Sequence, residues 1–152
     1  MNTKLRALAA GAIAVATLAL SVVTAGTAQA ESAPGCSGTV QIGSTAYVDY
    51  GGQHIASVKQ FKGCGKNWAY VYAWQGFVDS GKGFTLRTAI GAFGSASQQE
   101  ADRYLGLTIG RHDQRELWSP GTDTLSTCTA AFGAVVIDGV DSTPDNHTSI
   151  RC

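Results

Sequence analysis

The three histidines, His54, His112 and His147, are the side chains best suited to proton transfer or metal binding near neutral pH. They lie far apart along the chain, and none has the spacing of a zinc-binding motif. Asp113 directly follows His112, a pair that resembles two members of a catalytic triad. Neighbouring residues of an extended chain point apart, however, and no Gly-x-Ser-x-Gly motif supplies a nucleophile. The sequence therefore predicts a non-enzyme with no catalytic residue, metal site or cofactor.

Four aromatic residues alternate with small ones over residues 68–74, namely Trp68, Tyr70, Tyr72 and Trp74. Every second side chain of a β-strand points to the same side, so we expect the four rings to share one face. Such a row could form a platform for sugars or peptide side chains. The alternative is that the rings fill the core, which we expect for Tyr70 and Tyr72, with Trp68 or Trp74 nearer the rim. All four are candidate binding residues.

Trp118 is a further candidate binding residue, in the stretch Leu-Trp-Ser-Pro-Gly at residues 117–121. Proline and glycine are typical of turns, so we expect this stretch to be an exposed loop. A rigid loop loses little entropy on binding, and one that carries a tryptophan could occupy the cleft of a hydrolase. Trp118 therefore motivates an alternative function, that of a protein inhibitor.

The first 30 residues have the three parts of a secretory signal peptide. Lys4 and Arg6 supply positive charge, an apolar run spans residues 7–23, and Ala-Gln-Ala at residues 28–30 forms a cleavage site. We expect residues 31–152 to be exported as a single domain with no membrane segment left after cleavage. An uncleaved anchor is the alternative, because the apolar run is almost long enough to span a bilayer.

All four cysteines, Cys36, Cys64, Cys128 and Cys152, follow the expected cleavage point. An even number of cysteines in an exported chain predicts disulfides, and the lack of a Cys-x-x-Cys motif argues against zinc. Four cysteines allow three pairings. We favour Cys36 with Cys64 and Cys128 with Cys152, because each bond would close a local β unit and fasten one end of the domain.

The exported part is almost neutral. Loss of Lys4 and Arg6 leaves nine basic residues against 11 acidic ones, a net charge of −2 over residues 31–152 with neutral histidines. Nucleic-acid binding draws most of its affinity from basic side chains that neutralise phosphates. This composition therefore argues against a nucleic-acid partner.

Short runs rich in β-branched and aromatic residues, separated by glycine and polar turn residues, predict an all-β fold. We expect a small, disulfide-stapled antiparallel β-sandwich or barrel. Its clearest unit is a hairpin over residues 54–77, with Cys64 and its flanking glycines in the turn. At most one short helix is expected, from Ser97 to Tyr104, because Ser97 and Glu100 match a capping box. Further strands are expected over residues 38–42, 45–50, 84–93, 105–110, 125–132 and 135–138.

One segment carries a resemblance to known proteins. It begins with Cys-Ser-Gly-Thr-Val at Cys36, contains Gly-Cys-Gly-Lys-Asn-Trp-Ala at residues 63–69, and ends at Trp74. With the four-cysteine layout, it resembles small exported proteins of filamentous actinobacteria, in particular the spore-associated protein type. It also resembles an uncharacterised exported domain in which a cysteine shortly precedes Asn-Trp-Ala. Neither group has an established catalytic residue, so the resemblance implies a location, at the cell wall or spore surface, more than a mechanism.

The leading functional hypothesis is a secreted, non-enzymatic binding protein associated with the cell surface or the spore. Its partner would be a cell-wall polymer or another extracellular protein. The alternative is an inhibitor of an extracellular hydrolase, which would use the loop that carries Trp118.

Overall fold

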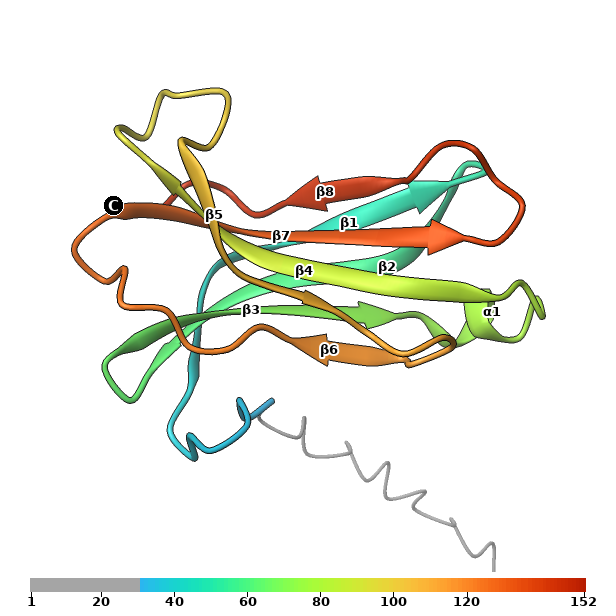
Figure 1. Cartoon of the computed structure of the whole chain (residues 1–152), viewed down its shortest axis with the longest axis horizontal. Helices are drawn as coiled ribbons and strands as arrows, with labels where there is room; N and C mark the ends of the chain where they lie inside the picture. Colours follow the sequence, from blue (N-terminus) through green and yellow to red (C-terminus); the bar gives the residue numbers. More distant parts are fainter. Residues whose placement is uncertain (1–30) are drawn as a thin grey trace, which may run out of the picture.

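The computed structural model describes residues 31–152, which form two antiparallel sheets packed face to face (Figure 1). We call them sheet A and sheet B; each has four strands. The fold-class prediction is confirmed in its sandwich form. Sheet A has the order β1-β2-β3-β6, formed by Val40–Tyr50, Gln53–Gly63, Lys66–Ala73 and Glu116–Trp118. Sheet B has the order β5-β4-β7-β8, formed by Arg103–Ile109, Phe84–Phe93, Cys128–Ile137 and Asp145–His147.

The predicted hairpin is present and forms the middle of sheet A. Its strands β2 and β3 pair up to Gly63 and Lys66, which leaves Cys64 and Gly65 as the turn. Both turn residues have positive φ angles, 50° and 73°, as a two-residue turn between twisted antiparallel strands requires. Glycine adopts such angles freely, and Cys64 adopts one while its sulfur is bonded to Cys36.

Two strands are continuous where the sequence predicted breaks. In β1, the break predicted at residues 43–44 is only an irregularity in the pairing with β2, at Gly43 with a φ of 76°. In β7, the break predicted at residues 133–134 is absent. Gly133 serves packing instead, because a Cβ at this position would lie 2.5 Å from Val58 Cγ2 in sheet A. Glycine here lets the two sheets approach each other.

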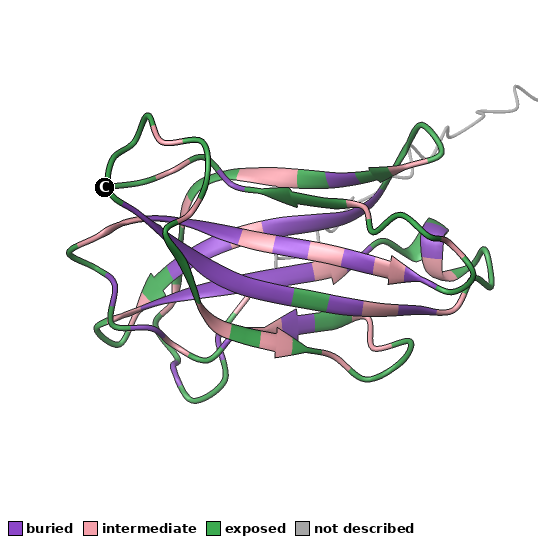
Figure 2. Ribbon diagram, turned by 45° about the horizontal axis from the view of Figure 1, so that its top comes forward, coloured by how far each residue is buried: buried purple, intermediate pink, exposed green. Residues whose placement is uncertain are grey.

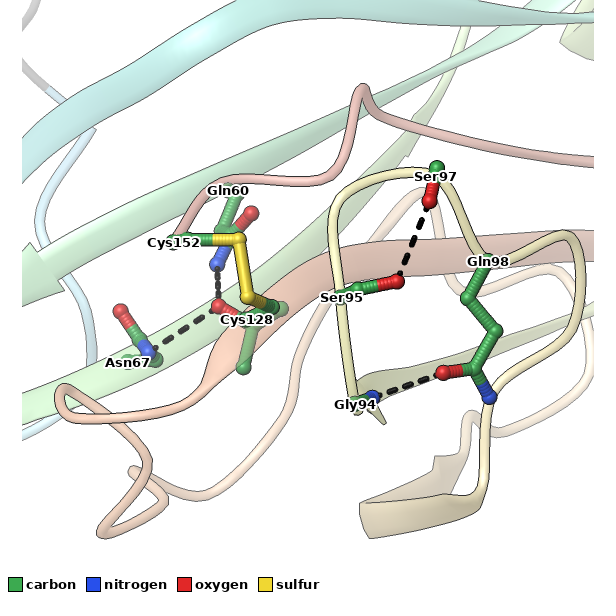
Figure 3. Close-up of a disulfide and its surroundings, with 9 residues drawn as sticks. Gln60, Asn67, Gly94, Ser95, Ser97, Gln98, Cys128 and Cys152 are labelled. Carbon is green, nitrogen blue, oxygen red and sulfur yellow. Dashed lines mark hydrogen bonds between the residues drawn. A yellow bond between two sulfur atoms is a disulfide. The ribbon is translucent and has the colours of Figure 1, made fainter.

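The predicted helix at Ser97 is wrong, and among residues 31–152 the α-helix is α1, Gln75–Val78. The side chain of Gln98 organises the loop before β5 instead (Figure 3). Its Oε1 accepts a hydrogen bond from the Gly94 amide at 2.8 Å, and its Nε2 donates to Asp102 Oδ1 at 2.6 Å. Such local bonds from a polar side chain compete with helix formation, and here they prevail.

The core between the sheets consists of aliphatic and small side chains from the two inner faces. Val58 and Val71 of sheet A and Leu86, Ile90 and Val135 of sheet B are all 0% exposed. Figure 2 shows mostly buried central strands flanked by strands with exposed residues.

One end of this core is polar and lies beside the bond between Cys128 and Cys152 (Figure 3). Gln60 Nε2 donates to Thr129 Oγ1 at 2.7 Å, and Asn67 Nδ2 donates to the same oxygen at 3.3 Å. Both amide side chains are buried, so these bonds offset the loss of water and join sheet A to β7.

Both predicted disulfide pairs are confirmed. The bond from Cys36 to Cys64 fastens the segment before β1 to the β2–β3 turn, and the bond from Cys128 to Cys152 fastens the end of the chain to β7. The predicted signal peptide, residues 1–30, lies outside the described residues. Within residues 31–152, no helix has the length and apolar character needed to cross a membrane.

Candidate functional site

The aromatic face of β3 points away from the core between the sheets. The small residues of β3, such as Val71, pack into that core. Alternation therefore places Trp68, Tyr70 and Tyr72 on the outer face of sheet A, where Trp68 and Tyr70 belong to a second, smaller cluster. Tyr70 is buried, as expected of a core residue, but its core is on the opposite side of the sheet from the main one.

This outer face of sheet A is covered by other parts of the chain. Only 8% of Trp68 and 2% of Tyr70 is exposed. Phe61 of β2 and Trp118 of β6 flank these rings, because they pair with Trp68 and Tyr70, and residues of the segment 33–36 pack against the same cluster. The Trp118 ring centroid lies 4.6 Å from that of Tyr70 and 5.0 Å from that of Phe61. The predicted platform is therefore closed over its middle.

The polar edge of this cluster is paired within the protein. The Tyr70 hydroxyl donates a hydrogen bond to Glu116 Oε2 at 2.9 Å. Burial of the ring, together with the neighbouring Glu116 carboxylate, raises the pKa of Tyr70. The Arg115 guanidinium lies 4.9 Å from the centroid of the Tyr72 ring, in a cation–π contact. The Tyr70 hydroxyl and the Tyr72 ring are therefore engaged within the protein and are less available to a ligand.

Trp118 does not lie in an exposed loop, so that prediction is wrong. It is the last residue of β6, pairs with Tyr70 of β3, and packs into the cover described above. The next residue, Ser119, is 2% exposed, and its hydroxyl accepts a hydrogen bond from the Ala69 amide at 2.9 Å. The stretch thus follows the edge of sheet A instead of leaving it.

Trp74 leaves the row because it follows the last residue of β3. Its ring meets the rings of Tyr47 and His54 edge to face, with centroids 5.8 Å apart in each case. The His54 ring also hydrogen-bonds Asp49. Trp74 is 38% exposed and lines, with His54, a hollow of about 610 Å³ beside α1. It is the most exposed of the five predicted binding residues.

The outer face of sheet B carries another row of rings. Phe132 of β7 lies between Tyr104 of β5 and His147 of β8, with centroid distances of 4.8 Å to each. The Tyr104 ring is perpendicular to Phe132, whereas His147 stacks on it. Gly91 of β4 makes room for Phe132, because a Cβ there would lie 2.5 Å from its ring. The row thus crosses all four strands of sheet B.

This second row borders an open groove. Tyr104 is 55% exposed and Leu107 is 65% exposed. Beside them lies a groove of about 320 Å³, which Phe132 also lines. Ala89 of β4 and Ala134 of β7 line it as well, and small side chains on these central strands leave space above the sheet.

Two opposite charges line the groove, Arg87 of β4 and Asp145 of β8. Both are exposed, and neither forms an ion pair or a side-chain hydrogen bond with another residue of the described part of the chain. Partial burial, with the negative charges of Asp145 and Glu100, raises the pKa of Tyr104. The groove therefore combines aromatic rings, a neutral phenol and a balanced pair of charges.

No family model, curated protein or solved structure matches this chain. The likeness to exported actinobacterial proteins stays a prediction.

The histidine best placed for chemistry, His112, is held by two carboxylates. Its Nδ1 lies 2.9 Å from Asp113 Oδ2 and its Nε2 lies 2.8 Å from Asp138 Oδ2. The expectation that His112 and Asp113 point apart is wrong. With both ring nitrogens paired to carboxylates, however, the imidazole has none left to activate a nucleophile. Within residues 31–152, no three His, Cys, Asp or Glu side chains gather as metal ligands.

Tyr104, Phe132 and His147 could not be predicted as site residues from the sequence, because each stands alone in its own strand. Only the pairing of β5, β4, β7 and β8 brings them together. A weak local signal does exist in β7, where the outward positions on either side of Phe132 are alanines. One large ring among small residues on a strand face predicts a hollow beside that ring.

Proposed function

We propose that this protein is an exported, non-enzymatic binding protein of the cell envelope, and that the outer face of sheet B is its binding surface. The ligand would be a cell-wall polymer or another extracellular protein. One observation carries the proposal: the chain buries Trp68 and Tyr70 on sheet A but leaves Tyr104 and Leu107 on sheet B more than half exposed. Exposed apolar patches rimmed by polar residues are typical of interaction sites.

Export is supported by the tripartite N-terminus and by the two disulfides. Disulfides persist mainly in oxidising compartments, among them the space outside the cell. The resemblance to spore-associated proteins favours a position at the cell surface. These observations agree on compartment and leave the ligand to be inferred from the groove.

A non-enzymatic role is supported by the side chains that are near the groove. Among the residues that line it, one is a carboxylate, Asp145, whereas glycoside hydrolysis commonly uses two. His112, which could act as a base, pairs with two carboxylates instead. The inhibitor hypothesis loses its motivation, because the stretch that carries Trp118 packs along sheet A.

The test is retention of the purified protein, with both disulfides intact, on isolated cell walls of the producing organism. We expect the wild type to be retained and Tyr104→Ala to be washed off. Tyr47→Ala is the matched control, because Tyr47 is a partly exposed tyrosine of sheet A. Equal retention of the two variants, or no retention of the wild type, would contradict the proposal.

A further inference from the structure

We propose that the groove on sheet B binds a neutral polysaccharide. A pyranose ring would lie against Tyr104, beside Phe132, and its hydroxyl groups would bond to Arg87 and Asp145. This inference rests on the proposed function, because it uses the same groove, and it selects one class of ligand for it.

The rings supply the apolar part of this recognition. A pyranose has hydroxyl groups around its edge and C–H groups on its faces, so a face can exclude water against an aromatic ring. Tyr104 offers such a ring, because it is 55% exposed and meets Phe132 edge to face. Phe132 is itself held in place, because His147 stacks on it and a Cβ on Gly91 would lie 2.5 Å from its ring. A ring ordered before binding loses little entropy when the ligand arrives.

The shape of the groove suits a chain better than an isolated small molecule. Its volume of about 320 Å³ is at the low end of the range of about 300–1,000 Å³ that small-molecule sites span. It lies on the outer face of the sheet, between the exposed edge strands β5 and β8. A polymer could therefore place a short stretch in the groove and continue past either edge.

The charges favour a neutral ligand. Arg87 and Asp145 are the two charges that line the groove and they balance each other, while Glu100 adds a negative charge near Tyr104, so the groove offers no net attraction to an anionic polymer. Both side chains lack partners in residues 31–152, which leaves the guanidinium free to donate and the carboxylate free to accept. Hydroxyl pairs on a sugar can do both, and hydrogen bonds to charged groups are the stronger ones.

The competing occupant is an apolar surface of a protein, because Leu107 and Ile109 on β5 are also exposed. Such a partner would need the aliphatic side chains of β5 more than the charges of the groove. The two ligand classes therefore differ in their dependence on Arg87 and Asp145, and variants can separate them.

The experiment measures binding of the purified protein to cellohexaose and chitohexaose by calorimetry, with an oligogalacturonate as the anionic probe. We expect at least one neutral oligomer to bind and the anionic one to bind more weakly. Tyr104→Ala and Arg87→Ala should each weaken binding about tenfold, a factor that corresponds to ~1.4 kcal/mol. The matched controls Tyr47→Ala and Arg111→Ala should bind as the wild type does.

Two outcomes would overturn this inference alone. One is stronger binding of the anionic oligomer. The other is failure of both neutral oligomers to bind while Tyr104→Ala still abolishes retention on cell walls, a result that leaves the proposed function intact and assigns the groove to another ligand. If Tyr104→Ala changes neither assay, the proposed function fails as well. Because Tyr104 and Arg87 are exposed, we expect both variants to fold, and a thermal melt checks this.

Discussion

The two outer faces of the sandwich carry similar rings and differ in what lies over them. On sheet A, alternate positions of one strand present Trp68, Tyr70 and Tyr72, and on sheet B separate strands contribute one ring each. On sheet A, Trp118 flanks Tyr70 from the neighbouring strand, and the segment that the bond from Cys36 to Cys64 holds in place packs against the same rings. On sheet B, Tyr104 is still 55% exposed.

The alternation of residues along a strand decides which side chains share a face of the sheet. Segments distant in sequence decide whether that face stays exposed to solvent. Tyr70 is buried by side chains from distant segments of the chain, among them Cys36 and Trp118. Neither is a neighbour of β3 in sequence. Closely spaced aromatic rings expose a large apolar area, so packing of another segment against them is favourable. Rings spread over several strands expose less contiguous apolar area.

The largest effect that distinguishes the two faces should come from removing one tyrosine ring from each. Tyr70→Ala removes a buried ring and leaves a cavity, so the free energy of unfolding should fall by about 3–5 kcal/mol. Tyr104→Ala removes an exposed ring and should cost less than about 1 kcal/mol. Urea unfolding of both variants measures the comparison.

Tyr70→Phe is the control for this pair, because it keeps the ring and removes only the hydroxyl that donates to Glu116. Its cost should be about 1–3 kcal/mol, since it removes a hydrogen bond to a charged group. Equal losses for Tyr70→Ala and Tyr104→Ala would mean that the two faces are equally covered, and our description of them would be wrong.

Most of the fold could be predicted because it depends on local signals. Residues 84–93 form a strand with the predicted ends, and Gly63, Cys64 and Gly65 mark the hairpin turn. The disulfide pairs followed from this local reading, since each bond joins ends of neighbouring β units. The errors arose where a local signal served a distant contact. Gly133 marked no break, because it makes room for Val58 of the other sheet.

The candidate site was harder to predict for the same reason. The row on β3 could be read from the sequence as an alternating run. Its burial could not be read in this way, because it depends on distant segments that pack against it. The row on sheet B depends on the register of β5, β7 and β8. That register cannot be predicted from three residues that are far apart in sequence. Trp118 was misplaced because Pro120 and Gly121 suggested a loop, whereas pairing with Tyr70 decides its position.

The cover of sheet A should also open when its disulfide is removed. Replacement of Cys36 and Cys64 by serine should lower the free energy of unfolding by about 3–4 kcal/mol in the chain-entropy model. It should also free the segment 33–36 and let water reach Trp68, which would shift tryptophan fluorescence to longer wavelength in the folded protein. Fluorescence spectra at low urea concentration, together with unfolding curves, measure both effects.

The matched control replaces Cys128 and Cys152, which are separated by 24 residues where Cys36 and Cys64 are separated by 28. Loops of nearly equal length should give nearly equal losses of stability. The fluorescence shift should be absent, because this bond lies beside Gln60 and Asn67 and not over the aromatic cluster. A shift of the same size in both variants would show that the cover does not depend on Cys36.

The smallest expected effect concerns the segment that passes from the open sheet to the covered one. Residues 110–115 connect β5 of sheet B to β6 of sheet A, and His112 in this segment pairs with Asp138 at the end of β7 and with Asp113. The hydrogen bond to Asp138 and the charge of Asp113 raise the pKa of His112 above its ordinary value of 6.5. The folded state therefore binds this proton more tightly than the unfolded chain does.

The sign of the pH dependence follows from that difference. The stabilising contribution of His112 is fully present below the unfolded pKa of 6.5 and is lost as the pH rises through the higher folded value. Wild type should thus exceed His112→Gln in stability at about pH 5.5, and the difference should shrink at about pH 9. The effect should be small because the histidine is exposed to solvent and salt screens it.

Asp138→Asn removes the main cause of the shift, so in that background His112→Gln should lose most of its pH dependence. Urea unfolding of the four proteins at both pH values measures this, and a difference between wild type and His112→Gln that grows with pH would contradict the assigned pairing.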